Sequence, residues 1–86
     1  MPTISAFYGI LILMRFLDHN PPHFHVEYAE KKATIDIEKL TILEGSLPRR
    51  ALNLVLDWAE LHQDELRKNW ELCRQHKQPI HIQPLS

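Results

Sequence analysis

The feature that most constrains the fold of this chain is a run of eight residues, Asp18 to His25, with the sequence Asp-His-Asn-Pro-Pro-His-Phe-His. It contains a carboxylate and three of the chain's six histidines. Pro21 and Pro22 lack backbone donors and hold the residues before them in extended conformations, which excludes a helix here. The polar side chains around this corner need hydrogen-bonding partners once the chain folds. We therefore expect the rest of the chain to be arranged around a stiff, non-helical connection rich in imidazole.

A β-hairpin is predicted ahead of this corner. Residues 3–7 alternate weakly between polar and apolar side chains, and Tyr8-Gly9 separates them from a segment, Ile10 to Phe16, that is apolar as far as Met14. Two short strands joined by two residues, one of them a glycine, are typical of a hairpin. The second strand is apolar on both faces as far as Met14, which predicts a central position with a neighbour on each side.

Two more strands are predicted after the corner. In residues 23–28 and again in residues 33–38, every second side chain is apolar. If both apolar sets face one core, even-numbered residues of the first strand must pair with odd-numbered residues of the second. A four-residue loop between the strands would then bring imidazoles beside carboxylates on the opposite face. The predicted pairs are Tyr28 with Ala33, His25 with Asp36, and His23 with Glu38.

Two helices are predicted in the C-terminal half. Residues 41–44 are expected to form a short strand, after which Ser46 is a candidate N-cap. From Leu47 to Leu61 the apolar residues cover most of a helix, so this helix is expected to be the more buried one. A second helical pattern runs, after a break, from Asp64 as N-cap to Gln75, because one continuous helix would be too long for so small a domain. The following residues, 80–82, are expected to form a short edge strand or an extended tail.

Together these elements predict one α+β domain that spans residues 1–86. An antiparallel meander of four or five strands is followed by two C-terminal helices packed on one face. The helices are expected to cover Phe24, Val26, Ile35 and Ile37, which leaves the histidine face open. A chain of 86 residues with a hydrophobic content of 44% is large enough for one core.

The composition restricts the expected partners and compartment. The formal net charge is −1 with neutral histidines, so general attraction to nucleic acid is not expected, and any such contact would be local. The single cysteine, Cys73, cannot form an internal disulfide, and neither a signal peptide nor a bilayer-spanning apolar run is predicted. We therefore expect a cytoplasmic protein that does not enter a membrane.

The densest chemical feature is a candidate divalent metal site at the corner. Imidazole nitrogens and carboxylate oxygens are ligands for zinc, manganese or nickel, and a His-x-His pair on a strand places two rings on one side. His19, His23 and His25 are the candidate ligands. Asp18 or Asp36 would orient a ring or act as a base. A coordinated water would make the site a metal-assisted hydrolase of nuclease type.

Other uses of the same residues stay open. The histidines can satisfy backbone groups beside the prolines, and a cross-strand pair of histidine and aspartate can simply stabilise a sheet. A metal-free ribonuclease with His19 and His25 as acid and base is a third alternative. Separately, Arg49 and Arg50 lie at a predicted helix start, where two guanidinium groups are candidates for binding an anionic ligand or cofactor. Exposed surface charge is the simpler interpretation of that pair.

Nearly the whole chain resembles the domain-of-unknown-function 4160 family of small bacterial proteins. The most distinctive strings are Asp-His-Asn-Pro-Pro-His-Phe-His at residues 18–25 and Pro-Arg-Arg-Ala at residues 48–51. The chain departs from the family pattern at Leu13, where a basic residue is common. Further matching segments are Met1–Ser5, Phe7–Ile10, Ile35–Ile37, Gly45, Leu47–Leu52, Trp58, Leu61-His62 and Asn69-Trp70.

The resemblance implies a short cytoplasmic prokaryotic protein. Family members are often encoded beside another small uncharacterised domain, in an arrangement similar to toxin–antitoxin pairs, and some are labelled transcriptional regulators by association. This implies a small binding or regulatory module that acts through a protein encoded nearby, with nucleic acid as a further candidate partner and self-association left open. We take this as the leading prediction of function and the metal-assisted hydrolase as the alternative. Whether the chain is an enzyme stays open at this point.

Overall fold

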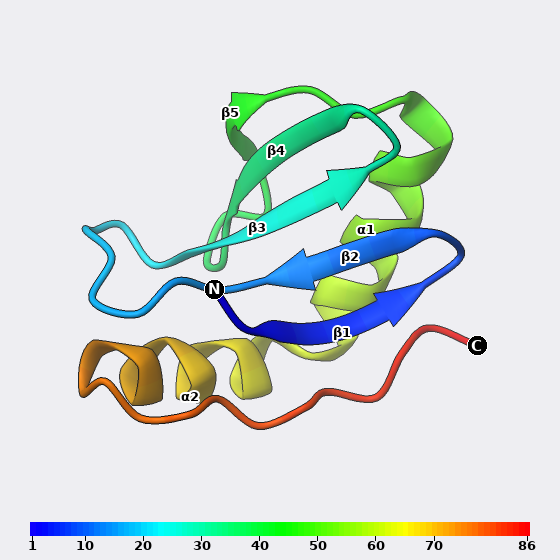
Figure 1. Cartoon of the computed structure of the whole chain (residues 1–86). Helices are drawn as coiled ribbons and strands as arrows, with labels where there is room; N and C mark the ends of the chain where they lie inside the picture. Colours follow the sequence, from blue (N-terminus) through cyan, green and yellow to red (C-terminus); the bar gives the residue numbers. More distant parts are fainter.

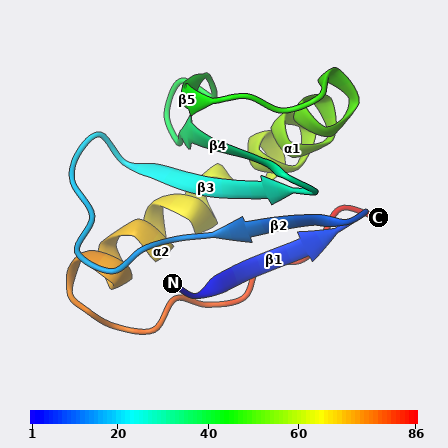
Figure 2. The ribbon, with the colours of Figure 1, turned by 45° about the horizontal axis from the view of Figure 1, so that its top comes forward.

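The computed structural model describes all residues from 1 to 86 and contains one sheet and two helices. Five antiparallel strands form the sheet, and the helices follow the last strand in sequence. Both helices lie on the same side of the sheet (Figures 1 and 2). The predicted α+β fold is therefore confirmed. The elements are β1 (Thr3–Phe7), β2 (Ile10–Leu13), β3 (His23–Tyr28), β4 (Lys31–Asp36), β5 (Ile42–Gly45), α1 (Arg49–Leu61) and α2 (Gln63–Arg74).

The strands follow one another across the sheet in the order β1-β2-β3-β4-β5. β2 pairs with β1 on one side and with β3 on the other, so its predicted central position is confirmed. At the turn between β1 and β2, Tyr8 and Gly9 have φ values of 50° and 77°. Two successive residues with positive φ form a turn whose twist matches that of a hairpin. The predicted hairpin is therefore confirmed as well.

The register between β3 and β4 differs from the predicted one. The turn has two residues in place of four, because Ala29 adopts a left-handed conformation with a φ of 53°. As a result, His25 lies opposite Thr34, and His23 lies opposite Asp36. Even-numbered residues still pair with odd-numbered ones. The predicted apolar and polar faces are therefore right, and the predicted pairs are wrong.

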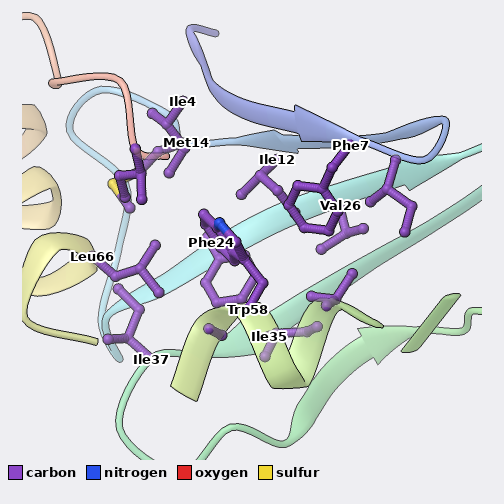
Figure 3. Close-up of a cluster of buried hydrophobic side chains, with 14 of the residues drawn as sticks. Ile4, Phe7, Ile12, Met14, Phe24, Val26, Ile35, Ile37, Trp58 and Leu66 are labelled. Atoms are coloured by element: carbon purple, nitrogen blue, oxygen red, sulfur yellow. The ribbon is translucent and has the colours of Figure 1, made fainter. Parts of the chain in front are cut away.

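The core lies between the sheet and the helices. Phe24 and Val26 of β3, Ile35 of β4 and Ile37 just after it are fully buried. Trp58 of α1 packs against Phe24 with the ring centroids 6.1 Å apart. Figure 3 shows these side chains meeting beside α1. The four residues that were expected beneath the helices are therefore confirmed in that position.

The helix boundaries correct two predicted caps. α1 begins directly after Pro48 and has no side-chain cap, so the prediction of Ser46 as N-cap is wrong. Proline favours a helix start because its missing donor is not needed there. α2 begins at Gln63 after a break at His62, so the predicted break is confirmed and Asp64 lies inside the first turn. Neither helix is long and apolar enough to cross a membrane.

The segment after α2 covers one edge of the sheet. It runs beside β1 as an extended tail and forms no strand of its own (Figures 1 and 2). The Ile82 N–H donates to the Ile4 carbonyl at 2.8 Å. The Ser5 hydroxyl donates to the Ile82 carbonyl at 2.9 Å. Of the two alternatives predicted for this segment, the extended tail is therefore right.

Side chains of both helices hold the tail in place. The Asn69 amide of α2 donates to the Ile80 carbonyl at 2.7 Å and accepts the Ile80 N–H at 2.8 Å. The Trp58 indole of α1 donates to the Gln83 carbonyl at 2.8 Å. These bonds satisfy backbone groups that would otherwise need a partner strand.

The opposite edge of the sheet is uncovered. β5 pairs with β4 on one side, and all four of its residues are exposed. Ile42 and Leu43 therefore present apolar side chains to solvent. Gly45 ends the strand with a φ of 78°, and a Cβ there would lie 2.1 Å from the Lys32 carbonyl oxygen. Only glycine fits this position.

Candidate metal centre

The corner brings Asp18 onto two histidines of β3. Figure 1 shows residues 14–22 as a loop that leaves the sheet after β2 and returns at the start of β3. Asp18 Oδ2 lies 2.9 Å from His23 Nε2 and 3.2 Å from His25 Nε2. One carboxylate oxygen therefore faces both rings.

His23 is held between two acceptors. Its Nδ1 lies 2.6 Å from the Pro21 carbonyl oxygen, which can only accept, so Nδ1 carries a hydrogen. On a neutral ring the Nε2 atom then has a lone pair, which would face the acceptor Asp18 Oδ2 at 2.9 Å. A shared proton or a metal ion must therefore join these two atoms.

Burial and hydrogen bonds set the charges of Asp18 and His25. Burial raises the pKa of Asp18, but hydrogen bonds from His25, the His19 backbone N–H and His23 outweigh it and hold the pKa well below its ordinary range. Burial is the main influence on His25 and lowers its pKa, and the Asp18 carboxylate opposes this only in part. Near neutral pH, Asp18 is therefore an anion and His25 is a neutral ring. Both are the forms that bind a metal.

The three residues lie close enough together to hold a metal ion between them. One oxygen of Asp18 and one nitrogen each of His23 and His25 lie within 4.8 Å of one another. Ligands that share a zinc ion at its usual distances are roughly 3 to 3.5 Å apart. The observed 2.9 and 3.2 Å are close to this range. The Pro21 carbonyl also fixes the His23 ring in the way that outer partners usually fix metal-binding histidines.

The predicted ligand His19 lies outside this group. Its side chain is 87% exposed, and its Nδ1 lies 2.9 Å from Asp18 Oδ1, the oxygen that is not shared by the other two histidines. Its backbone N–H donates to the same oxygen at 2.9 Å. His19 therefore orients the carboxylate from the solvent side.

The second predicted carboxylate, Asp36, is used elsewhere. It lies opposite His23 in the sheet, but its Oδ1 accepts the backbone N–H groups of Glu38 at 2.8 Å and Lys39 at 2.9 Å. These bonds stabilise the turn after β4, which is a common role for aspartate. Asp36 is not part of the three-residue group.

Trp70 is a neighbour of the group that the sequence pattern did not indicate. This residue of α2 packs against His23 with ring centroids 5.1 Å apart, and His23 is only 3% exposed. The prediction that the helices leave the histidine face open is therefore right for His25 and wrong for His23. No local spacing relates these two aromatic rings, because the contact depends on how α2 docks against the sheet.

A hollow of about 700 Å³ adjoins the group on the side of the sheet away from the core. Asp18 and His25 line it, together with Arg15 and Lys32. Strand alternation could have indicated Arg15, because it follows Leu13, the partner of His25, by two residues. The hollow gives a substrate or water access to the three-residue group.

Arg49 and Arg50 lie at a different place. Both are exposed at the start of α1, and neither forms an ion pair. Arg50 borders a second hollow of about 410 Å³ with Tyr8 and Tyr28. The start of α1 lies at the opposite end of the sheet from the histidine corner (Figure 1). The arginines therefore contribute no group to the histidine centre.

Comparison with known proteins gives one family match. The family model described as "Domain of unknown function (DUF4160)" matches residues 9–71 of the 86 residues. No curated protein and no solved structure matches the chain. The matched region contains Asp18, His23 and His25, so the three-residue group lies within the part of the chain that defines the family.

Proposed function

The chain belongs to the DUF4160 family, and from its site we propose that it is a divalent-metal protein in which Asp18, His23 and His25 hold the ion. The chemistry that follows is metal-assisted hydrolysis, since a bound ion lowers the pKa of coordinated water enough to form hydroxide near neutral pH. Zinc, manganese and nickel all suit two imidazoles and a carboxylate.

One observation carries the proposal. Asp18 Oδ2 is shared by two Nε2 atoms, and because the other nitrogen of His23 is bound to the Pro21 carbonyl, a proton or a metal ion must join His23 Nε2 to that oxygen. A metal ion would use lone pairs from all three side chains at once. A proton shared between His23 and Asp18 is the alternative, and a metal-binding experiment distinguishes the two.

The arrangement leaves room for a reaction. Three protein ligands are typical of catalytic metal sites, in which the remaining positions accept water or substrate. His23, His25 and Asp18 all border the hollow, and His23 is also buried. An ion held by these side chains would therefore adjoin the hollow.

Metal content after purification without a histidine tag tests the proposal. We expect about one equivalent of zinc, manganese or nickel by mass spectrometry, because the ligand atoms already have suitable spacing. His23→Gln and His25→Gln should each lose the metal. His81→Gln in the exposed tail is the matched control and should keep it.

A protein that binds none of these ions after removal of adventitious metal would contradict the proposal. Nuclear magnetic resonance should then find a proton shared between His23 Nε2 and Asp18 Oδ2. RNA cleavage that persists in chelator would point instead to acid–base catalysis by His19 and His25.

A second candidate function, the partner-binding module of a toxin–antitoxin-like pair, is favoured by a different feature. The β1 edge is covered by the chain's own tail, whereas β5, a strand of four residues with one charged side chain, Glu44, exposes Ile42 and Leu43 and has no covering segment. An uncovered edge strand can add an extended segment of another protein. The supporting feature is therefore an edge that the chain leaves free for pairing.

Co-purification with the protein encoded by the neighbouring gene tests this second candidate. Leu43→Lys should abolish the association by placing a charge on the edge. Leu61→Lys, at an exposed position on α1, should leave it intact. Equal binding by both variants, together with no binding of nucleic acid at low salt, would contradict a role as a binding module.

A further inference from the structure

We infer that the hollow beside the metal centre binds a phosphate ester, with its anionic oxygens held between the metal ion and the Arg15 guanidinium. This inference rests on the proposed metal function and names the class of substrate. The hollow of about 700 Å³ is within the size range of sites for small ligands such as a nucleotide.

The charges around the hollow make anion binding depend on the metal. Arg15 and Lys32 border the hollow, and neither forms an ion pair. Three carboxylates face the same space, those of Asp18, Glu27 and Glu44. Met1 also borders the hollow, and its amino group is a further cation, so with neutral histidines three positive groups face three carboxylates. A divalent ion would add two positive charges, so an anion is attracted more strongly after the metal has bound.

Arg15 is the cation placed to share an anion with the metal. It follows Leu13, the last residue of β2 and the partner of His25, by two residues, and it borders the same hollow as His25. Lys32 lies farther along the face, opposite Glu27. A guanidinium can bind two phosphate oxygens at once, which suits it to this role.

The lining indicates what part of the ligand is recognised. It contains no phenylalanine, tyrosine or tryptophan, so only imidazole rings and the Arg15 guanidinium offer a surface on which a base would stack. Recognition would therefore fall mainly on the phosphate. A metal ion held by these residues would supply hydroxide for the hydrolytic step, and the hydroxide oxygen would form the new bond to phosphorus. The ester oxygen would leave with the electron pair of the broken P–O bond and take a proton from water.

Calorimetric titration of the full chain with adenosine monophosphate tests this inference, with manganese-loaded and metal-free protein compared. We expect binding at least about tenfold tighter with metal, because the ion adds two positive charges to the hollow. Arg15→Gln should weaken binding to the loaded protein about tenfold. Arg50→Gln is the matched control and should change affinity less than about twofold, since it lies at the other hollow.

The possible outcomes separate this inference from the proposed function. If metal binds but affinity is equal with and without it, or if only Arg50→Gln weakens binding, the inference fails and the metal function stands. If no metal binds, both fail. Should Arg15→Gln not fold, the exposed Lys32→Gln is the second variant and should weaken binding by a smaller factor. A parallel titration with single-stranded RNA distinguishes a mononucleotide from a nucleic-acid strand as the source of the phosphate.

Discussion

The side chains on the two faces of β3 have different surroundings. Phe24 and Val26 point into the core and are fully buried among other apolar residues. His23 and His25 alternate with them on the other face and meet the carboxylate of Asp18. Six residues of one strand thus supply part of the packing and two members of the candidate site.

The difference lies in what fixes each side chain. An apolar core side chain is held by many weak contacts, so its volume matters more than the direction of any one contact. His23 is held by two directed contacts, one to the Pro21 carbonyl and one to Asp18, and both come from outside the strand. We therefore expect changes on the core face to alter stability, and changes on the histidine face to alter metal binding.

The largest effect is expected from Phe24→Ala. Removing a fully buried aromatic ring that packs on Trp58 should lower the free energy of unfolding by about 3–5 kcal/mol. Urea denaturation of the metal-free protein measures this change. A loss below about 1 kcal/mol would mean that the core face does not depend on this ring.

His25→Ala, at the next position of the strand, should lower metal affinity strongly and stability only slightly. Metal affinity is expected to fall at least about 100-fold, which corresponds to about 2.7 kcal/mol, because one of three ligands is lost. The unfolding free energy of the metal-free protein should change by less than about 1 kcal/mol, since the ring is only partly buried. Equilibrium dialysis and urea denaturation give the two values. A large loss of stability without a loss of affinity would erase the distinction between the faces.

A third substitution compares the two aspartates near His23. Asp36→Asn should lower the unfolding free energy by about 1–2 kcal/mol, because its Oδ1 accepts two backbone N–H groups in the turn after β4. Metal affinity should stay within about threefold of the unmodified chain. Asp18→Asn is the matched change and should lose the metal. If Asp36→Asn loses it too, Asp36 contributes to the site despite its place in the turn.

The smallest expected effect is the response of the metal-free protein to mild acid. The pKa of His25 is lowered from its ordinary 6.5 in the folded state, so below that pH the unfolded chain takes up the proton more readily. Stability should therefore be independent of this group above pH 6.5 and should fall as the pH drops below it. Asp18, whose pKa is lowered from 3.8, adds a further loss only below about pH 4. Denaturation at several pH values measures the slope, and His25→Gln should flatten it.

Much of the fold follows from alternation in the sequence. The period of two in residues 23–28 and 33–38 assigned Phe24, Val26, Ile35 and Ile37 to the core, and the structure buries all four. The exact strand pairs could not be predicted in this way. They depend on the length of the turn between β3 and β4. That length is set by Ala29, which adopts a left-handed conformation although it is neither glycine nor asparagine.

The candidate site, too, could be predicted only in part from the sequence. Local spacing identifies His23 and His25 as neighbours, but it does not decide which carboxylate faces them. That choice depends on the path of the loop that carries Asp18. The role of Asp36 could have been read from the sequence, because an aspartate that precedes a turn commonly accepts backbone N–H groups two and three residues on.

The tail beside β1 has a consequence for how the protein is made. Ser5 and Ile82 are bonded although they lie 77 positions apart in the chain. During synthesis, the first hairpin leaves the ribosome long before the segment that covers its outer edge. A nascent chain therefore carries an uncovered strand until residues 80–83 have cleared the exit tunnel, and protection by a chaperone would matter most in that interval.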